Sequence, residues 1–364
     1  REVSWARRCV YATGIASSIY KQGEQARDAG DLETAVTHFE RLGQAVPDSR
    51  FRETAEYDAA AALIAMESWD RASGVLETFR RNYPDSQYSD DITQKLAVTY
   101  LEAGQGAQAA GEFVRIANAE GTSEELKREA LWRASDLFKE SGEVAREQEV
   151  LENIVARYPN PIAESIEARF RLLEISEQSN DNVRRGQILR DMVRVDATAG
   201  AQRTDRTRYL AATASLELAE PVRRSFMVMK VTQPLAESMK LKRSLMEDVL
   251  KVYGDAAAYG VAEVTTAATF RLGEVYRQFA TDLMDSERPA GLDELALEQY
   301  DLLLEEQTFP FEEKAIELFE TNAARTTDGV WDEWVERSFD ELATLLPARY
   351  AKMELSENVV TAIY

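Results

Sequence analysis

The 364-residue chain contains a single cysteine, Cys9, and a single histidine, His38. One cysteine excludes an intrachain disulfide and leaves the redox environment open. The two residues are far apart in sequence, so we expect neither a Cys–His nucleophile pair nor a metal site built from soft or imidazole ligands. Gly104-Gln105-Gly106 follows no strand, so it is interpreted as a turn and not as a phosphate loop. We therefore expect no catalytic residue, no cofactor and no metal.

Long apolar runs and an excess of positive charge are also missing. No segment approaches the about 18 consecutive apolar residues that indicate a transmembrane helix. The formal net charge of −22 opposes binding to nucleic acids, because the field of the chain repels polyanions. The sequence begins with Arg1 instead of Met, which we interpret as a processed or trimmed chain; a signal peptide or lipid anchor upstream stays open.

The charge is distributed unevenly along the chain. Residues 184–251 hold 14 Lys and Arg against 8 Asp and Glu, whereas residues 282–341 hold 4 against 19. Such asymmetry favours contacts with protein partners, although solvated helix faces also explain it. An alternative is an enzyme or enzyme-regulating domain that uses the acidic region, where Glu305-Glu306 are candidate cation ligands.

A repeat of 37 residues dominates the N-terminal part of the chain. Small residues recur at Gly23, Ala60 and Ala97, and bulky ones at Phe39, Leu76 and Phe113. Within each unit the apolar residues are three or four apart, which predicts one face of each of two short helices. We expect the small residues to let the paired helix approach closely and the bulky ones to fill the gap to the next unit.

Proline with a small polar residue marks the end of each unit. The stretch Tyr83-Pro84-Asp85-Ser86 repeats Val46-Pro47-Asp48-Ser49. Proline ends a helix because it has no N–H for the hydrogen-bond ladder, and Asp or Ser can accept hydrogen bonds at the start of the next helix. We expect Tyr83 to pack beneath this joint.

The rest of the chain follows the pattern less closely, and the sequence predicts three regions. Residues 1–200 form an array of about five hairpins, 201–260 an irregular helical connector containing Pro221 and Pro234, and 261–364 further hairpins with a long acidic insertion. We expect one hairpin at 266–309, in which Gly273 lies on the first helix and Leu295 and Leu303 on the second, and a last unit at 311–347. No strand pattern occurs, so the predicted fold class is all-α.

This pattern of small residues, aromatic fillers and terminal proline resembles the tetratricopeptide repeat. The resemblance implies a right-handed superhelix, or solenoid, whose groove is lined by the first helix of each unit and binds a protein or peptide. It assigns one groove column to Tyr20, Tyr57, Gln94 and Trp132, and another to Arg27, Ile64 and Leu101. The family's clamp for chaperone tails is absent. An equally weighted alternative is that Tyr57 and Trp132 pack between neighbouring helices.

Two further resemblances concern location. The segments RLGEVYRQFATDLMDSERPAGL (271–292) and GVWDEWVERSFDELATLLPARYAKME (329–354) are similar to bacterial envelope proteins associated with gliding motility and Tol/Exb-type complexes. The YPDS joints are similar to those of the periplasmic Tol–Pal coordination protein and outer-membrane assembly lipoproteins. These resemblances imply a non-enzymatic scaffold in the bacterial periplasm. Self-assembly of the chain into an oligomer is the structural alternative.

Overall fold

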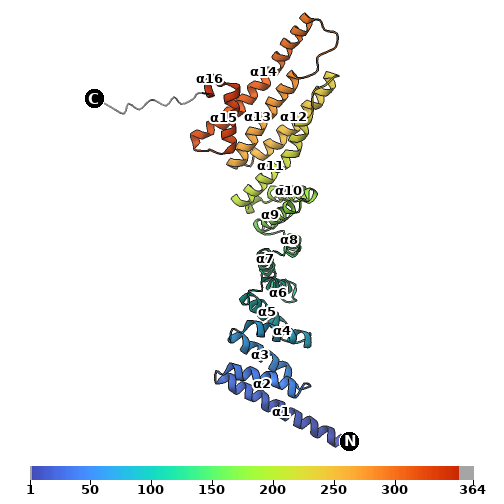
Figure 1. Cartoon of the computed structure of the whole chain (residues 1–364), viewed down its shortest axis with the longest axis vertical. Helices are drawn as coiled ribbons and strands as arrows, with labels where there is room; N and C mark the ends of the chain where they lie inside the picture. The colour runs from blue at the N-terminus through green and yellow to red at the C-terminus, as the bar shows by residue number, and fades with distance from the viewer. Residues whose placement is uncertain (1, 352–364) are drawn as a thin grey trace, which may run out of the picture. The chain divides into compact units, whose positions relative to one another are not determined.

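The computed structural model describes the backbone of residues 2–351 and the side chains of residues 11–351. Within this range the secondary structure is helical, without strands, and each helix packs mainly on its neighbours in sequence (Figure 1). The prediction of an all-α solenoid of helical hairpins is confirmed. Contacts divide the chain into unit 1 (Arg1–Pro159) and unit 2 (Asn160–Tyr364).

Unit 1 consists of four hairpins in its described part. Its helices are α1 (Glu2–Asp28), α2 (Leu32–Ala45), α3 (Arg52–Ala65), α4 (Trp69–Asn82), α5 (Ser89–Glu102), α6 (Gly106–Asn118), α7 (Glu124–Glu140) and α8 (Val144–Arg157). The predicted fillers Phe39 and Leu76 are fully buried, as are their neighbours Leu42 and Phe79. The 37-residue repeat therefore places the core of the first two hairpins correctly.

Unit 2 contains longer helices. They are α9 (Ile162–Gln178), α10 (Asn182–Ala197), α11 (Asp205–Val228), α12 (Leu235–Ala257), α13 (Ala262–Met284), α14 (Glu294–Ala324), α15 (Glu333–Leu345) and α16 (Pro347–Tyr350), with short 3-10 turns at Gly200–Gln202 and Arg325–Asp328. Residues 201–260, predicted to be an irregular connector, contain the hairpin of α11 and α12. The predicted domain limits at 200 and 260 stay a prediction.

The turn inside the hairpins repeats one backbone conformation. A positive φ recurs at intervals of 37 or 38 residues, at Gly30, Glu67, Gly104, Gly142 and Asn180. The following N–H then reaches back into the last turn of the first helix, as from Gln105 to the Tyr100 carbonyl (2.8 Å). This pattern satisfies carbonyls that the helix end leaves open, so it fixes the position of each second helix.

Glycine sets the distance between helices in both units. A Cβ atom added to Gly23 would lie 2.5 Å from the Phe39 ring, and one added to Gly273 would lie 2.6 Å from the Phe319 ring. No real Cβ contact is this short. The predicted role of Gly23 in close helix approach is confirmed, and Gly273 has the same role in unit 2.

The predicted hairpin at 266–309 is wrong in its second helix. α14 continues through Pro310, and the residue that packs on Gly273 is Phe319, whereas Leu295 and Leu303 are exposed. Pro310 is itself exposed, so water can hydrate the carbonyl that loses its helical partner. Pro310, which separates the predicted units 266–309 and 311–347, therefore lies inside a helix, as does Pro221 in α11.

A buried ion pair lies at the turn of the hairpin formed by α11 and α12 and links this turn to α13. The Lys242 ammonium is fully buried and donates hydrogen bonds to the carbonyls of Phe226 and Met229, both at 2.7 Å. Its third partner is the Asp282 carboxylate of α13, at 2.6 Å. Burial alone would raise the pKa of Asp282, but hydrogen bonds from Lys242 and Lys230 outweigh burial and hold it below the usual value. This cluster ties three helices together.

Candidate functional site

An apolar groove lies between α5, α6 and α7 of unit 1. Its volume is about 520 Å³. The apolar residues that line it are Ala97, Val98, Phe113, Ile116, Leu126, Ala130 and Trp132. Val98 has 50% of its surface exposed and Leu126 has 45%, which is unusual for aliphatic side chains that gather in one place. We call this site the α5–α7 groove.

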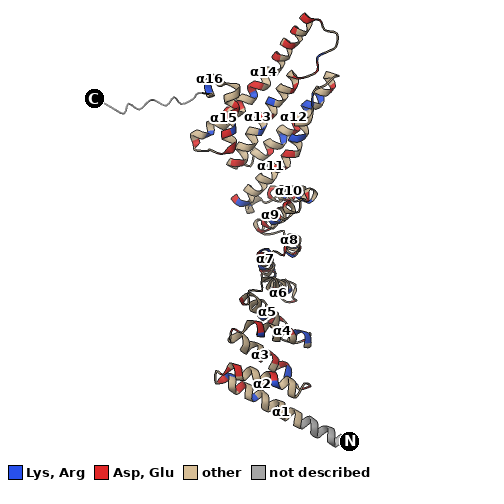
Figure 2. Ribbon diagram, in the orientation of Figure 1, with Lys and Arg blue, Asp and Glu red and all other residues tan. Residues whose placement is uncertain are grey.

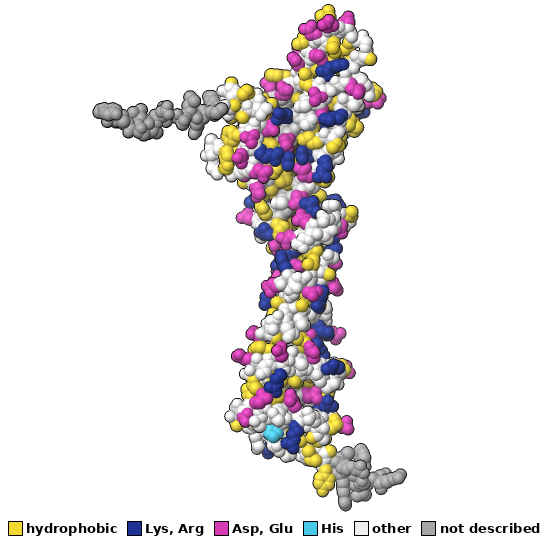
Figure 3. All heavy atoms as spheres, viewed as in Figure 1, with side chains coloured by type: hydrophobic (Ala, Val, Ile, Leu, Met, Phe, Trp, Pro, Cys, Tyr) yellow, Lys and Arg dark blue, Asp and Glu magenta, His cyan; other side chains and the backbone are white. Residues whose placement is uncertain are grey.

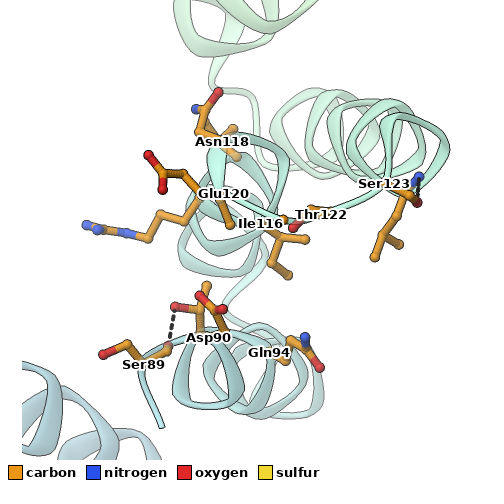
Figure 4. Close-up of a pocket in the computed structure, with 14 residues that line it drawn as sticks. Ser89, Asp90, Gln94, Ile116, Asn118, Glu120, Thr122 and Ser123 are labelled. Carbon is orange, nitrogen blue, oxygen red and sulfur yellow. Dashed lines mark hydrogen bonds between the residues drawn. The ribbon is translucent and has the colours of Figure 1, made fainter. Parts of the chain in front are cut away.

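A more polar hollow of about 720 Å³ adjoins the groove and shares Gln94, Ile116 and Leu126 with it. Figure 4 shows Gln94 on α5 and Ile116 on α6 bordering this space. The polar lining also includes Ser89 and Asp90 at the start of α5, Arg115 and Asn118 on α6, and Glu120, Thr122 and Ser123 before α7. The two hollows together offer an apolar floor with a hydrogen-bonding edge.

The first two joints of unit 1 are filled by aromatic pairs. Tyr20 of α1 stacks on Phe51 before α3, with ring centroids 5.8 Å apart. Tyr57 of α3 stacks on Tyr88 before α5, at 4.4 Å. In each pair the rings fill the space between the first helices of two successive hairpins. A separate hollow of about 450 Å³ lies on another side of the first joint, between α2, α3 and α4.

The third joint lacks such a pair. Counted back from the positive-φ residue of each hairpin turn, Gln94 takes the position of Tyr20 and Tyr57, and Leu126 takes that of Phe51 and Tyr88. An amide and an aliphatic side chain fill less space than two stacked rings, so the joint stays open. The loop between α6 and α7 also differs, because Gly121 and the N-cap Ser123 replace the Pro-Asp-Ser joint.

The predicted column Tyr20, Tyr57, Gln94 and Trp132 divides into two parts. The Tyr20 hydroxyl donates to Asp58 (2.6 Å) and the Tyr57 hydroxyl donates to Asp91 (2.7 Å), so both tyrosines contact the following hairpin. Gln94 is exposed and Trp132 half-buried, and both line the α5–α7 groove. The column as a binding surface stays a prediction.

The two tyrosines carry an electrostatic consequence of this packing. Burial, followed by the hydrogen bond to Asp91, raises the pKa of Tyr57 to about 12. Burial and the hydrogen bond to Asp58 raise the pKa of Tyr20 in the same direction. Both hydroxyls therefore remain protonated donors at physiological pH.

The second predicted column is more scattered. Arg27 lies 3.7 Å from the Asp58 carboxylate that also accepts the Tyr20 hydroxyl. Ile64 packs against the cluster formed by Val36, Ala62, Leu63 and Ala72. Leu101 is half-buried near the end of α5. Arg27 and Tyr20 therefore both contact Asp58, whereas Ile64 belongs to a separate apolar cluster.

Sequence reasoning missed the contributions of Leu126 and of Phe113 with Ile116. Phe113 and Ile116 occupy the filler positions of the repeat, yet they are only half-buried because the joint above them is open. The signal that could have located the groove was the change from Tyr to Gln at position 94, combined with Leu at position 126.

The described side chains form no evident metal site. No group of three or more His, Cys, Asp or Glu side chains among them could hold a metal ion. His38 is half-buried on α2, and the side chain of Cys9 lies outside the described residues. No helix in the described part of the chain is long and apolar enough to cross a membrane.

One family model matches the N-terminal part of the chain. The family YfiO, described as outer membrane lipoprotein, matches residues 13–178, less than half of the chain, and this match includes the α5–α7 groove. No curated protein matches.

Several solved structures align with the chain at low identity. A tetratricopeptide repeat protein from Parabacteroides merdae is 13% identical, with a TM-score of 0.29 over 71% of this chain and 98% of its own. Yeast Tom70 is 11% identical, with a TM-score of 0.30 over 92% of this chain and 70% of its own. Naa15/Naa10 bound to HypK-THB is 12% identical, with a TM-score of 0.32 over 90% of this chain and 53% of its own.

Proposed function

We propose that the chain is a non-enzymatic scaffold that binds a protein partner in the α5–α7 groove. The observation that supports this most directly is the gap left by Gln94 and Leu126 where the two preceding joints hold stacked rings. The hairpins on both sides of the gap are regular, but the two side chains between them, Gln94 and Leu126, are not aromatic. Covering the exposed apolar surface of Val98 and Leu126 with a partner removes it from water, which favours binding.

The chemistry of the groove suits an extended or helical peptide segment. Apolar side chains of the peptide would enter between Val98 and Trp132, since aromatic residues often anchor interfaces. The polar hollow at Gln94 and Ser123 offers groups that hydrogen-bond the peptide backbone. The rim carries both signs of charge, with Glu129, Arg133 and Asp136 on α7, so we expect the apolar contacts to contribute most of the affinity.

We place this scaffold in the bacterial periplasm, within an envelope-spanning complex of the Tol/Exb or gliding type. The match of residues 13–178 to an outer membrane lipoprotein family supports an envelope location. The complex type rests on the resemblance of the C-terminal segments. Fractionation of native cells tests the location: recovery of the full-length protein in the cytosolic fraction alone would contradict it.

The groove is tested with two matched substitutions. Val98→Asp puts a charge into the groove, whereas Val144→Asp puts the same charge on α8 outside it, at a similar exposure of 42%. Partners are captured from native cells by cross-linking and identified by mass spectrometry. We expect Val98→Asp to lose partners that the unchanged chain and Val144→Asp both retain. Equal capture by all three proteins, each with an unchanged circular dichroism spectrum, would remove the groove from the proposal.

A further inference from the structure

The N-terminal half of α14 carries an exposed apolar stripe in unit 2. Leu295, Leu302 and Phe309 follow one another at intervals of seven residues, which places them on one face of the helix. Their exposed fractions are 64%, 56% and 57%. Leu304 and Thr308 are buried and point the other way. Leu295, Leu302 and Phe309 therefore lie on the exposed face of α14, opposite the buried Leu304 and Thr308. We call these three exposed residues the α14 stripe.

The seven-residue pattern of the stripe continues toward the C-terminus of α14, where it packs against other residues of unit 2. Ile316 lies one more interval of seven along α14 and packs against the cluster that contains Phe319 and Leu342. Leu342 belongs to α15. One stretch of the seven-residue pattern is thus already covered within the chain, and its N-terminal continuation is exposed. Seven-residue spacing is the pattern of helices that pack along one another.

Acidic residues flank the stripe. Glu298 lies between Leu295 and Leu302, and Glu305 and Glu306 follow Leu302 by three and four residues on neighbouring faces. No Lys or Arg occurs between Arg288 and Lys314, and Arg288 contacts Asp301 (2.6 Å). Figure 2 shows acidic residues along this end of α14, and Figure 3 shows acidic and hydrophobic side chains side by side there. A partner must therefore supply both apolar surface and positive charge.

We propose that the α14 stripe docks an amphipathic α-helix of another protein, in which Lys or Arg flanks an apolar seven-residue repeat. A helix fits because it can extend along the stripe for about 24 Å, the length of Glu294–Phe309 at the usual rise per residue. A second copy of this chain, pairing stripe against stripe, would bring Glu298, Glu305 and Glu306 against their own counterparts, and facing like charges oppose such pairing. This site is independent of the α5–α7 groove.

The probe is a synthetic helical peptide with Leu at every first and fourth heptad position and Lys at the flanking ones, read by fluorescence anisotropy against the full chain. A second peptide replaces each Lys by Glu. We expect the Lys peptide to bind, to weaken with added salt and to lose affinity by roughly tenfold or more with Leu302→Asp. Leu241→Asp on α12, at a similar exposure of 52%, is the matched control and should leave affinity unchanged.

Several outcomes would overturn the assignment. One is that the Lys peptide does not bind. A second is that Leu302→Asp binds it as tightly as the unchanged chain, and a third is that the Glu peptide binds as well as the Lys peptide. Sedimentation of the chain alone adds a fourth: a dimer that Leu302→Asp dissociates assigns the stripe to a second copy instead. Val98→Asp should leave peptide binding intact, so that failure of the groove and failure of the stripe can be told apart.

Discussion

The joints of this molecule are closed in different ways. In unit 1, Tyr20 stacks on Phe51 and Tyr57 on Tyr88, while the joint of Gln94 and Leu126 is open. In unit 2, the buried ammonium of Lys242 binds the carbonyls at the end of α11, inside a hairpin turn. The hairpin is therefore the constant element of this solenoid, and the side chains at the contacts between helices decide which spaces are filled and which stay open.

The largest loss of stability is expected at the ion pair of Lys242 and Asp282. Asp282→Asn removes the carboxylate beside Lys242 and leaves a buried ammonium without its counter-charge. Breaking one side of a buried pair typically costs about 3–5 kcal/mol. Urea denaturation should show the transition of unit 2 at lower denaturant concentration. If the double variant Lys242→Met/Asp282→Asn is as unstable as Asp282→Asn alone, the uncompensated charge is not the cause.

A smaller effect is expected at an aromatic joint. Tyr57→Ala removes the ring that stacks on Tyr88 and the hydrogen bond to Asp91, and should lower the free energy of unfolding by about 2–3 kcal/mol. Gln94→Ala, at the same position of the next hairpin, should change it by less than about 0.5 kcal/mol because Gln94 is exposed. Equal losses in thermal or urea denaturation would contradict the distinction between a filled and an open joint.

We also expect the free energy of unfolding to depend on pH through Tyr57 at the same joint. The pKa of Tyr57 rises from 10.0 to about 12 on folding. Above the unfolded pKa, the unfolded chain loses this proton while the folded chain keeps it. The contribution of Tyr57 to the free energy of unfolding is therefore constant below pH 10 and falls as the pH rises toward 12. Denaturation midpoints measured between pH 9 and 11.5 should fall less steeply in Tyr57→Phe. An identical slope in that variant would exclude Tyr57 as a source.

The sequence predicts the repeated parts of this structure well and the exceptions poorly. The 37-residue period locates Phe39 and Leu76 in the core and Gly23 at the helix contact, because these positions repeat the same packing. The limits of α14 could not be predicted, since a proline usually ends a helix, and an exposed one such as Pro310 need not.

The α5–α7 groove was predicted only in part. Gln94 and Trp132 were on the predicted column, and both line it. The groove itself arises from an absence, the missing ring at position 94 and the aliphatic residue at 126, and its register depends on one inserted residue before α7. A pattern of apolar residues reports what fills a core, so it gives little information on where a space remains.

The most direct test of the account is to close the open joint. Gln94→Tyr/Leu126→Tyr restores at the third joint the aromatic pair that seals the first two. The measurement is capture of native partners by this variant, with a circular dichroism spectrum and melting temperature taken on the same sample. The account predicts a fold at least as stable as that of the unchanged chain and loss of the partners that Val98→Asp also loses. A stable double variant that still captures those partners would contradict the groove as the binding surface.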